Sequence, residues 1–326
     1  MAVSGRVLAA LAAVPLLCGT AGGQAPSPPA SPRPSSAPAA APPVRSGTSY
    51  TDYYGTRVTF PMGDISFADQ VVAFTAGKPH AKGDKYSKPE NALGAPNLDR
   101  KNDDGYVTLG CGGSITLRFI DNAVVDVKGD DLFMFEVPTD IEPTDVELSR
   151  DGKTWILVGT FGGGTASIDI AKKVKSGEAF AFLRLTDKKS TCYGGWPGAD
   201  VDAVGAIGSG IQLSLRSAVL FGTGKTALRP EAEQELHRVA EAIRAYAGAQ
   251  VLVDGHTDAV GPKPINLKLS QQRAWSVRQY LVDKEGIEAG KIQTRGFGPS
   301  VPLGPNDTPE GRERNRRVEI VVIPPK

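Results

Sequence analysis

The sequence predicts a multi-domain protein, with an all-β sandwich or jelly roll at residues 62–209 followed by an α+β domain at 210–326. In the first domain, Ile115, Leu117 and Phe119 alternate with polar residues, which is the period of a half-buried strand. In the second, apolar residues recur at helical spacing between short β-like runs. A chain of 326 residues is long enough for two such domains.

The first domain contains short strand patterns and no helical pattern between them. The expected strands are 114–119, 131–137, 146–149, 155–158 and 180–185. Asp151-Gly152 marks a hairpin turn between the third and the fourth. Short strands at this spacing are typical of a sandwich or a jelly roll.

The second domain follows the order β-α-β-α-β-β. Its expected strands are 211–221, 251–253, 292–296 and 317–323. One helix begins near Pro230, and a second carries Ala274, Val277 and Leu281 on one face, after a loop containing Gly261. This order predicts one mixed sheet with helices packed on one face.

The N-terminus predicts an exported protein. Residues 1–23 combine Arg6 with an apolar run from Val7 to Cys18, which is shorter than the ~20 residues that span a bilayer. The run is typical of a signal peptide cleaved after Ala21. Alternatively, Cys18 is the acylated residue of a lipoprotein, although Leu17 before it is atypical. Either way, we expect a periplasmic or outer-membrane-associated protein.

Residues 24–61 form a Pro/Ala/Ser-rich linker and a lead-in to the first domain. The linker is expected to be an extended, solvated spacer. After export, Cys111 and Cys192 are expected to form a disulfide, and a cysteine metal site is not expected because no histidine accompanies them. The net charge of +1, from 37 basic and 36 acidic residues, provides no case for nucleic-acid binding.

Several motifs in the second domain resemble a known family. GHTDAVG, NLKLSQQRAWSVRQYL and IQTRGFGPSVPLGPNDTPEGRERNRRVEIVV are similar to the peptidoglycan-binding OmpA-like domain, from about Leu213 to Ile323. The resemblance implies that Asp258 and Arg273 hold the diaminopimelate of the stem peptide. Asp258 would accept hydrogen bonds from its ammonium, and Arg273 would make a forked pair with its carboxylate.

The resemblance also implies supporting residues. Asn266 would help to line the groove, and Arg317 would lie near the ligand carboxylate, with Arg312, Arg314 and Arg316 on a solvated surface. Thr257 donates either to a ligand carbonyl or to its own turn, and Ser270 is either a groove residue or a helix cap. The family usually carries an F-D-x-N pattern after the first strand, whereas this chain has Phe221-Gly222-Thr223-Gly224-Lys225, so that side-chain contact is missing.

The first domain resembles galactose-binding-like (discoidin-type) jelly-roll modules through NALGAPN, VTLGCGGSITLRF, GDDLFMFEV, VELSRDGKTW and GADVDAVGAI. The resemblance supports the fold, and we expect this domain to bind a carbohydrate or an envelope protein. No cofactor is expected; the alternative is calcium, because that ion favours clustered carboxylates. The candidate ligands, which turn and capping roles explain equally well, are Asp103, Asp104, Asp130, Asp131, Asp200 and Asp202.

The resulting prediction is a non-catalytic protein that anchors to peptidoglycan. Its rivals are a glycan hydrolase-like enzyme targeted by the same domain and a structural protein whose domain has lost its ligand. GTGKT is not a phosphate loop, since Val219 stands where the first glycine is required. The histidines, His80, His237 and His256, are scattered and indicate no catalytic triad. The sequence leaves open the ligand of the sandwich, the lipid anchor and the oligomeric state.

Overall fold

The computed structural model describes residues 47–53, 55–97, 105–137, 142–162, 166–189 and 192–325. The predicted signal peptide, Cys18, the linker as far as residue 46, and the calcium candidates Asp103 and Asp104 lie outside the described residues. In the described ranges, none of the helices has the length and the apolar character that a membrane span requires.

The N-terminal part is built from short strands and single 3-10 turns. Its elements are β1 (Thr48–Thr51), β2 (Arg57–Phe60), η1 (Gly63–Ser66), β3 (Gln70–Thr75), η2 (Asp84–Ser87), η3 (Pro89–Ala92), β4 (Val107–Thr108), β5 (Ser114–Arg118), β6 (Asn122–Val125), β7 (Leu132–Glu136), β8 (Thr144–Ser149), β9 (Ile156–Phe161), β10 (Ala166–Ile168), β11 (Ala179–Phe180), β12 (Phe182–Asp187) and β13 (Asp200–Ala206).

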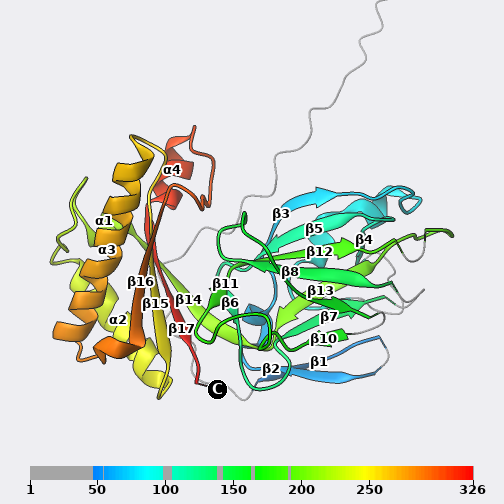
Figure 1. The fold of residues 1–326 in the computed structure, drawn as a ribbon, viewed down its shortest axis with the longest axis horizontal. Coiled ribbons are helices and arrows are strands. Elements are labelled where there is room, and N and C mark those ends of the chain that lie inside the picture. The colour runs from blue at the N-terminus through cyan, green and yellow to red at the C-terminus, as the bar shows by residue number, and fades with distance from the viewer. Residues whose placement is uncertain are drawn as a thin grey trace, which may run out of the picture. The chain divides into compact units, whose positions relative to one another are not determined.

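Two antiparallel sheets of this part share one hydrophobic core. One has the strand order β3-β5-β12-β8-β9 and the other β10-β7-β13-β4 (Figure 1). Ile115 and Leu185 of the first sheet and Leu132 and Val204 of the second lie in the same fully buried cluster. The β-rich architecture predicted for this part is therefore confirmed. The expected strand 180–185 is divided, since Phe180 ends β11 and Phe182 begins β12, which belongs to a different sheet.

The lead-in to the first domain contains a folded hairpin, β1–β2. Phe60, at its end, is fully buried, and its ring centroid lies 4.8 Å from that of Phe67 and 6.0 Å from that of Phe135. The folded part of the chain thus begins before residue 62, because an aromatic cluster needs these residues to close it.

The predicted disulfide is present. Cys111 and Cys192 are bonded, with their Cα atoms 5.2 Å apart. The bond joins the loop before β5 to the loop before β13, across 81 residues of sequence. A cross-link over such a separation constrains the unfolded chain substantially.

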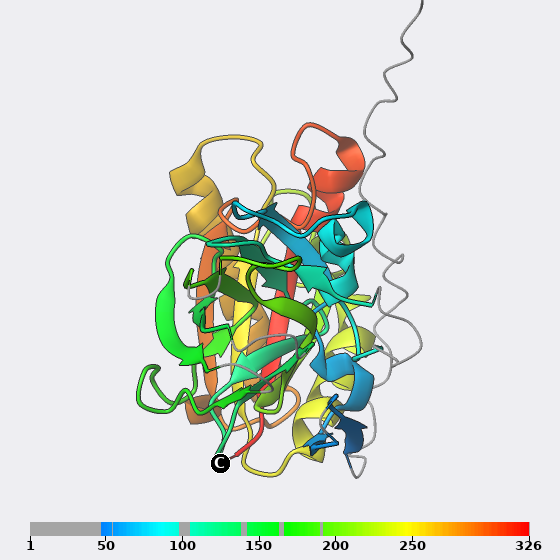
Figure 2. The same ribbon diagram turned by 90° about the vertical axis from the view of Figure 1, so that its right-hand side faces the viewer.

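The C-terminal part adds the strands and helices of an α+β domain. Its elements are β14 (Ser209–Arg216), α1 (Ser217–Leu220), α2 (Ala232–Ala245), β15 (Gln250–His256), α3 (Lys263–Asp283), η4 (Ala289–Lys291), β16 (Ile292–Gly298), α4 (Pro309–Asn315) and β17 (Arg317–Ile323). The strands β17, β15 and β16 lie side by side in Figure 2, in red, yellow and orange.

Helices α2 and α3 cover one face of this mixed sheet (Figure 1). Their apolar residues, including Leu236 and Val277, pack against Val253 and Ile320 of the strands. The predicted order of strands and long helices is confirmed, but helix α4 between β16 and β17 was not predicted, and the expected strand 211–221 was too long. It ends at Arg216 and is followed by the short helix α1.

The sheet extends across the predicted domain boundary at residue 210. Its strand order is β11-β6-β14-β17-β15-β16, so β6 and β11 of the first part belong to it. Strand β6 pairs antiparallel with β14, with Ser209 opposite Val124. This pairing satisfies the backbone groups along an edge that would otherwise be open.

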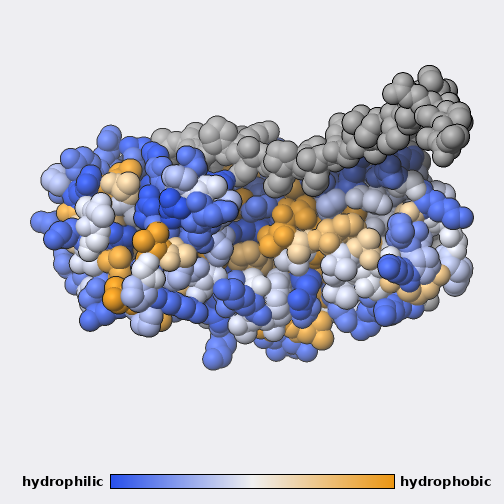
Figure 3. All heavy atoms as spheres, turned by 90° about the horizontal axis from the view of Figure 1, so that it is seen from above, coloured by the Kyte–Doolittle hydropathy of each residue, from blue (hydrophilic) through white to orange (hydrophobic). Residues whose placement is uncertain are grey.

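The face drawn in Figure 3 is largely hydrophilic, with apolar side chains in limited patches.

Candidate functional site

The predicted site lies where β15 ends and α3 begins. Asp258 follows the strand by two residues and is 9% exposed. The backbone N–H of Val260 donates to its Oδ1 at 3.1 Å, and Nη1 of Arg316 donates to its Oδ2 at 2.6 Å. The carboxylate is therefore held at a fixed position beside a guanidinium.

Arg273 lies midway along α3 and is 5% exposed. Its Nε donates to the carbonyl oxygen of Lys225 at 3.0 Å, and its guanidinium lies 5.0 Å from the centre of the Phe221 ring. Within the described chain its two Nη nitrogens make no hydrogen bond. One edge of the guanidinium is thus anchored, and its terminal fork is available to a ligand.

The charges of the site are close enough to influence one another. Burial lowers the pKa of Arg273, repulsion from Arg316 lowers it further, and attraction to Asp258 raises it. The structure thus brings Asp258 and Arg273 into one site, although the direct hydrogen-bond partner of Asp258 is Arg316. A buried guanidinium with free donors is stabilised by an incoming carboxylate.

The prediction for Arg317 does not agree with its placement. Arg317 is 2% exposed, its Nε donates to Oε1 of Glu319 at 2.6 Å, and its Nη2 donates to the carbonyl of Val301 at 3.2 Å. Arg316, expected on the solvated surface, is the arginine that reaches Asp258. Successive side chains in a strand point to opposite faces of the sheet. This alternation in the sequence indicates that Arg316 and Arg317 lie on different sides of it.

The other predicted residues arrange the loop that carries Asp258. Nδ2 of Asn266 donates to the carbonyl of Val260 at 2.9 Å, and Oγ1 of Thr257 donates to the carbonyl of Asp258 at 2.8 Å. Thr257 therefore bonds within its own turn, which was one of the two expectations for it.

Ser270 joins α3 to strand β16, and the alternative reading of it as a helix cap is wrong. It lies inside α3, where its Oγ accepts from the N–H of Gly298 at 2.9 Å. The helix approaches the strands so closely that a Cβ on Gly255 would lie 2.1 Å from the carbonyl oxygen of Ser270. This close packing of α3 on β15 brings Arg273 close to Asp258.

The loop that departs from the family pattern contributes its backbone. Gly224 has a φ of +67°, a conformation that favours glycine, and the N–H of Lys225 closes a turn onto the carbonyl of Gly222 at 2.9 Å. The turn aims the carbonyl of Lys225 at Arg273. A main-chain oxygen thus positions Arg273 where the family pattern expects acidic and amide side chains.

A separate set of buried charges lies on the opposite face of the sheet. Glu319 is 6% exposed and pairs with Arg317 and, at 3.8 Å, with Arg118 of β5. His256 is 2% exposed, with its Nε2 3.3 Å from Oε2 of Glu319 and its ring stacked on Phe297. Burial lowers the pKa of His256, and Arg317 lowers it further, so the imidazole is neutral. These groups join the two parts of the fold.

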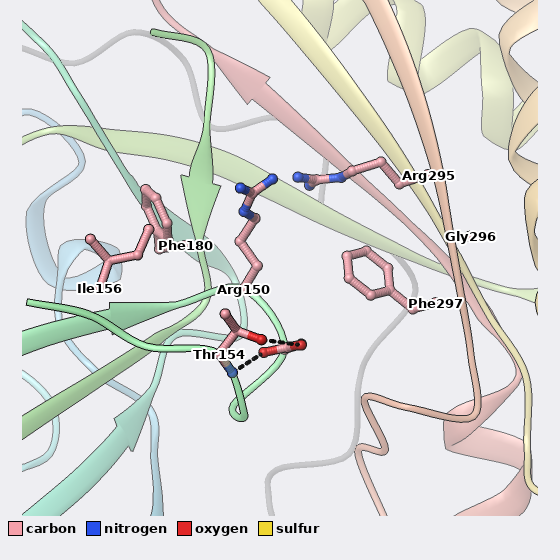
Figure 4. A pocket seen from close by; sticks show the side chains of 8 residues that line it. Arg150, Thr154, Ile156, Phe180, Arg295, Gly296 and Phe297 are labelled. Carbon is pink, nitrogen blue, oxygen red and sulfur yellow. Dashed lines mark hydrogen bonds between the residues drawn. The ribbon is translucent and has the colours of Figure 1, made fainter. Parts of the chain in front are cut away.

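A hollow of about 350 Å³ opens beside these charges (Figure 4). Arg150 and Arg295 extend into it toward one another from opposite walls. Each is already neutralised, since Arg150 pairs with Glu178 at 2.7 Å and Arg295 pairs with both oxygens of Asp254 at 2.7 and 2.5 Å. The hollow therefore has no excess charge that would select a ligand.

The calcium candidates have other partners. Asp130 accepts from Ser167 at 2.5 Å, Asp200 from the hydroxyl of Thr108, and Asp202 from the N–H of Asn97 at 3.1 Å. In the described ranges, carboxylates gather within 4.8 Å of one another only at Asp126, Asp131 and Asp169. Asp131 accepts there from two backbone N–H groups, of Val127 and Ile170. Only the bond from Val127 to Asp131 is local; the other bonds join segments that are far apart in sequence.

Glu136 at the end of β7 provides a test by pH. Burial raises its pKa to about 9, and Glu142, Asp200 and Asp187 add to the increase. Because the folded pKa exceeds the ordinary 4.5, the folded state loses stability as pH rises from 4.5 toward 9. We expect Glu136→Gln to stabilise the protein at pH 8 by about 2–4 kcal/mol, and to have little effect at pH 4.5.

Urea unfolding at both pH values measures this difference. A gain of equal size at pH 4.5 and pH 8 would show that Glu136 does not titrate in this way.

The fold and the site together define a class of domain. It is an α+β domain with a carboxylate and two guanidiniums at the carboxyl end of a buried strand. The sequence model of the OmpA family matches residues 220–316. This part of the chain is therefore an OmpA-like domain, as the sequence motifs predicted.

Relatives of this chain show the same likeness. It is 45% identical over 103 residues to outer membrane protein A of Bordetella avium, covering 32% of this chain and 53% of that protein. It is 42% identical over 114 residues to the peptidoglycan-binding protein ArfA of Mycobacterium tuberculosis, covering 35% of each. The chain thus spans about half the length, or less, of these relatives.

Among solved structures, the chain is similar to the cell wall anchor of the T6SS from Pseudomonas aeruginosa. The two are 37% identical, and the match covers 36% of this chain and 81% of the other, with a TM-score of 0.32.

Proposed function

We propose that this protein is a non-catalytic cell-envelope anchor that binds the diaminopimelate of peptidoglycan through its OmpA-like domain. The observation that carries the proposal is the convergence of Asp258, Arg273 and Arg316 at the loop between β15 and α3. The name of a similar protein supports it, since ArfA is described as peptidoglycan-binding.

The end of a diaminopimelate side chain carries an ammonium and a carboxylate. Asp258 accepts from the ammonium, while the free Nη fork of Arg273 donates to the carboxylate, with Nε already held by Lys225. Arg316 donates to Oδ2 of Asp258 and so orients its carboxylate. Both principal groups are more than nine-tenths buried, and the lower effective dielectric strengthens these contacts.

The N-terminal sheets complete the proposal. They form a galactose-binding-like jelly roll at 62–209 that presents a second surface to a carbohydrate or an envelope protein. Residues 1–23 export the chain to the periplasm, with outer-membrane association or acylation of Cys18 as its attachment. Residues 24–61 act as the spacer and lead-in.

A glycan hydrolase-like activity is the alternative to a purely anchoring role. It requires paired carboxylates in a groove. Among the described residues, Glu142 and Asp187 lie close enough to Glu136 to raise its pKa. All three carboxylates are at most 3% exposed, so they do not line an open groove. A turnover assay on purified cell wall separates the two, and release of soluble fragments would establish the enzyme.

Co-sedimentation with two kinds of peptidoglycan tests the anchor. We expect the protein to sediment with diaminopimelate-type wall and to bind lysine-type wall at least ~10-fold more weakly. Lysine lacks the distal carboxylate, and losing a charge-assisted pair costs about 1.5–3 kcal/mol. Equal sedimentation with both walls would contradict the role given to Arg273.

A further inference from the structure

The outer surface of α3 carries a second hollow of about 350 Å³. It is lined by Thr226, Gln271, Gln272, Trp275 and Ser276. Trp275 is 50% exposed, although tryptophan is one of the most buried residue types on average. No charged side chain lines this hollow.

The indole of Trp275 is supported from behind. The guanidinium of Arg278 lies 4.9 Å from the centre of the indole ring. Arg278 is itself anchored, because its Nε donates to the carbonyl of Ile292 at 3.2 Å and its Nη2 to that of Ala289 at 2.9 Å. A ring held on one side by an anchored cation presents its remaining surface to solvent at little further entropic cost.

The polar groups around the indole suit hydroxyl groups. Nε2 of Gln271 donates to Oγ1 of Thr294 at 3.1 Å, which orients that amide. Within the described chain the side-chain amide of Gln272 makes no hydrogen bond, so its donors and its acceptor are available. Uncharged amides and hydroxyls around an aromatic surface match a neutral sugar ring, which has an apolar face and polar edges. No cation is among the lining residues, and the guanidinium of Arg278 is already bonded to two carbonyl oxygens.

Residues that line the hollow are neighbours in sequence of residues that contact or form the Arg273 site. In the loop 221–226, Phe221 stacks on Arg273, Lys225 accepts its Nε–H, and Thr226 lines the hollow. Gln272 and Arg273 are neighbours on α3. Three residues of an extended stem peptide span ~10 Å. A helix with its side chains has about that diameter, so a stem peptide held at Arg273 is long enough to reach the outer surface of α3.

We propose that Trp275 and Gln272 form a subsite for a sugar ring of the glycan strand whose stem peptide is held by Arg273. The inference rests on the proposed function and extends it from the peptide to the glycan. Trp275 stacks on the sugar face, and the amide of Gln272 bonds a hydroxyl or acetamido group. The domain then binds the junction of peptide and glycan rather than the peptide alone.

Calorimetry with two soluble ligands tests the subsite in the full-length protein. One ligand is the free diaminopimelate-containing stem peptide, and the other is the same peptide attached to its disaccharide. We expect the disaccharide to increase affinity by about 5- to 30-fold, in the range of one aromatic contact and one hydrogen bond. Trp275→Ala should remove this increment and leave affinity for the free peptide unchanged, while Trp275→Phe should retain part of it.

The controls separate this inference from the function on which it rests. Tyr53→Ala removes another large aromatic side chain, 42% exposed, between β1 and β2 and outside the proposed jelly roll, and should change neither affinity. If the parent binds both ligands equally, or if Trp275→Ala keeps the full increment, the sugar subsite is wrong and the peptide site stands. If the parent binds neither ligand, the anchor function fails, and the subsite with it.

Discussion

Replacing Arg273 with alanine is expected to abolish co-sedimentation with diaminopimelate-type peptidoglycan, weakening binding by about 100-fold or more. The free fork of Arg273 can make a bidentate pair with the ligand carboxylate, since only its Nε is held by the chain. Truncating one partner of a buried, hydrogen-bonded charge pair costs about 2–5 kcal/mol. Asp258→Ala should have a comparable effect, since it removes the acceptor of the ammonium and leaves Arg316 unpaired.

Matched variants separate loss of binding from loss of folding. Arg273→Lys keeps the charge but not the fork, and we expect intermediate binding. Arg238→Ala on α2 and Asp283→Ala at the end of α3 remove exposed or half-exposed charges of the same kinds and should bind like the parent. If Arg273→Ala and Asp258→Ala both fold and both sediment like the parent, the domain has lost this ligand and serves a structural role.

Replacing Glu319 with alanine is expected to destabilise the protein by about 3–5 kcal/mol. Glu319 is the counter-ion of Arg317, which is 2% exposed, and it lies 3.8 Å from Arg118, which is also 2% exposed. Without it, two buried guanidiniums lose their shared carboxylate. Urea unfolding at pH 7 measures the change, with Glu310→Ala on the exposed side of α4 as the control. A difference below about 1 kcal/mol between the two variants would contradict this account.

The same cluster sets the response to acid. Burial raises the pKa of Glu319, but Arg317, His256 and Arg118 together outweigh it, so the pKa lies well below 4.5. Burial holds the pKa of His256 below 6.5. Both folded-state values are depressed, so both groups contribute stability that is present above their ordinary pKa values and is lost as pH falls. The contribution of these two groups to stability therefore falls below about pH 6.5, opposite in sign to that of Glu136. We expect the loss below pH 4.5 to be shallower in Glu319→Ala than in the parent.

Local pattern determined most of the secondary structure. Strand β17 has the predicted bounds because Val318, Ile320 and Val322 recur at the two-residue period of a strand, next to the β-branched residues Val321 and Ile323. The helical spacing of Ala274, Val277 and Leu281 placed the buried face of α3, and Arg273 lies beside it. The short helix α4 was missed, although Thr308-Pro309 carries a local cap signal: Oγ1 of Thr308 accepts from the N–H of Gly311 at 3.1 Å.

By itself, therefore, the sequence determined the two classes of fold, the OmpA-like domain, the disulfide, and the loop and helix that carry Asp258 and Arg273. Only the tertiary structure decided which of Arg316 and Arg317 faces Asp258, and that β6 and β11 complete the C-terminal sheet. The reason is physical. Periodicity and turn chemistry act between residues a few positions apart, whereas strand pairing and buried ion pairs join residues such as Arg118 and Glu319, which meet only after the chain has folded.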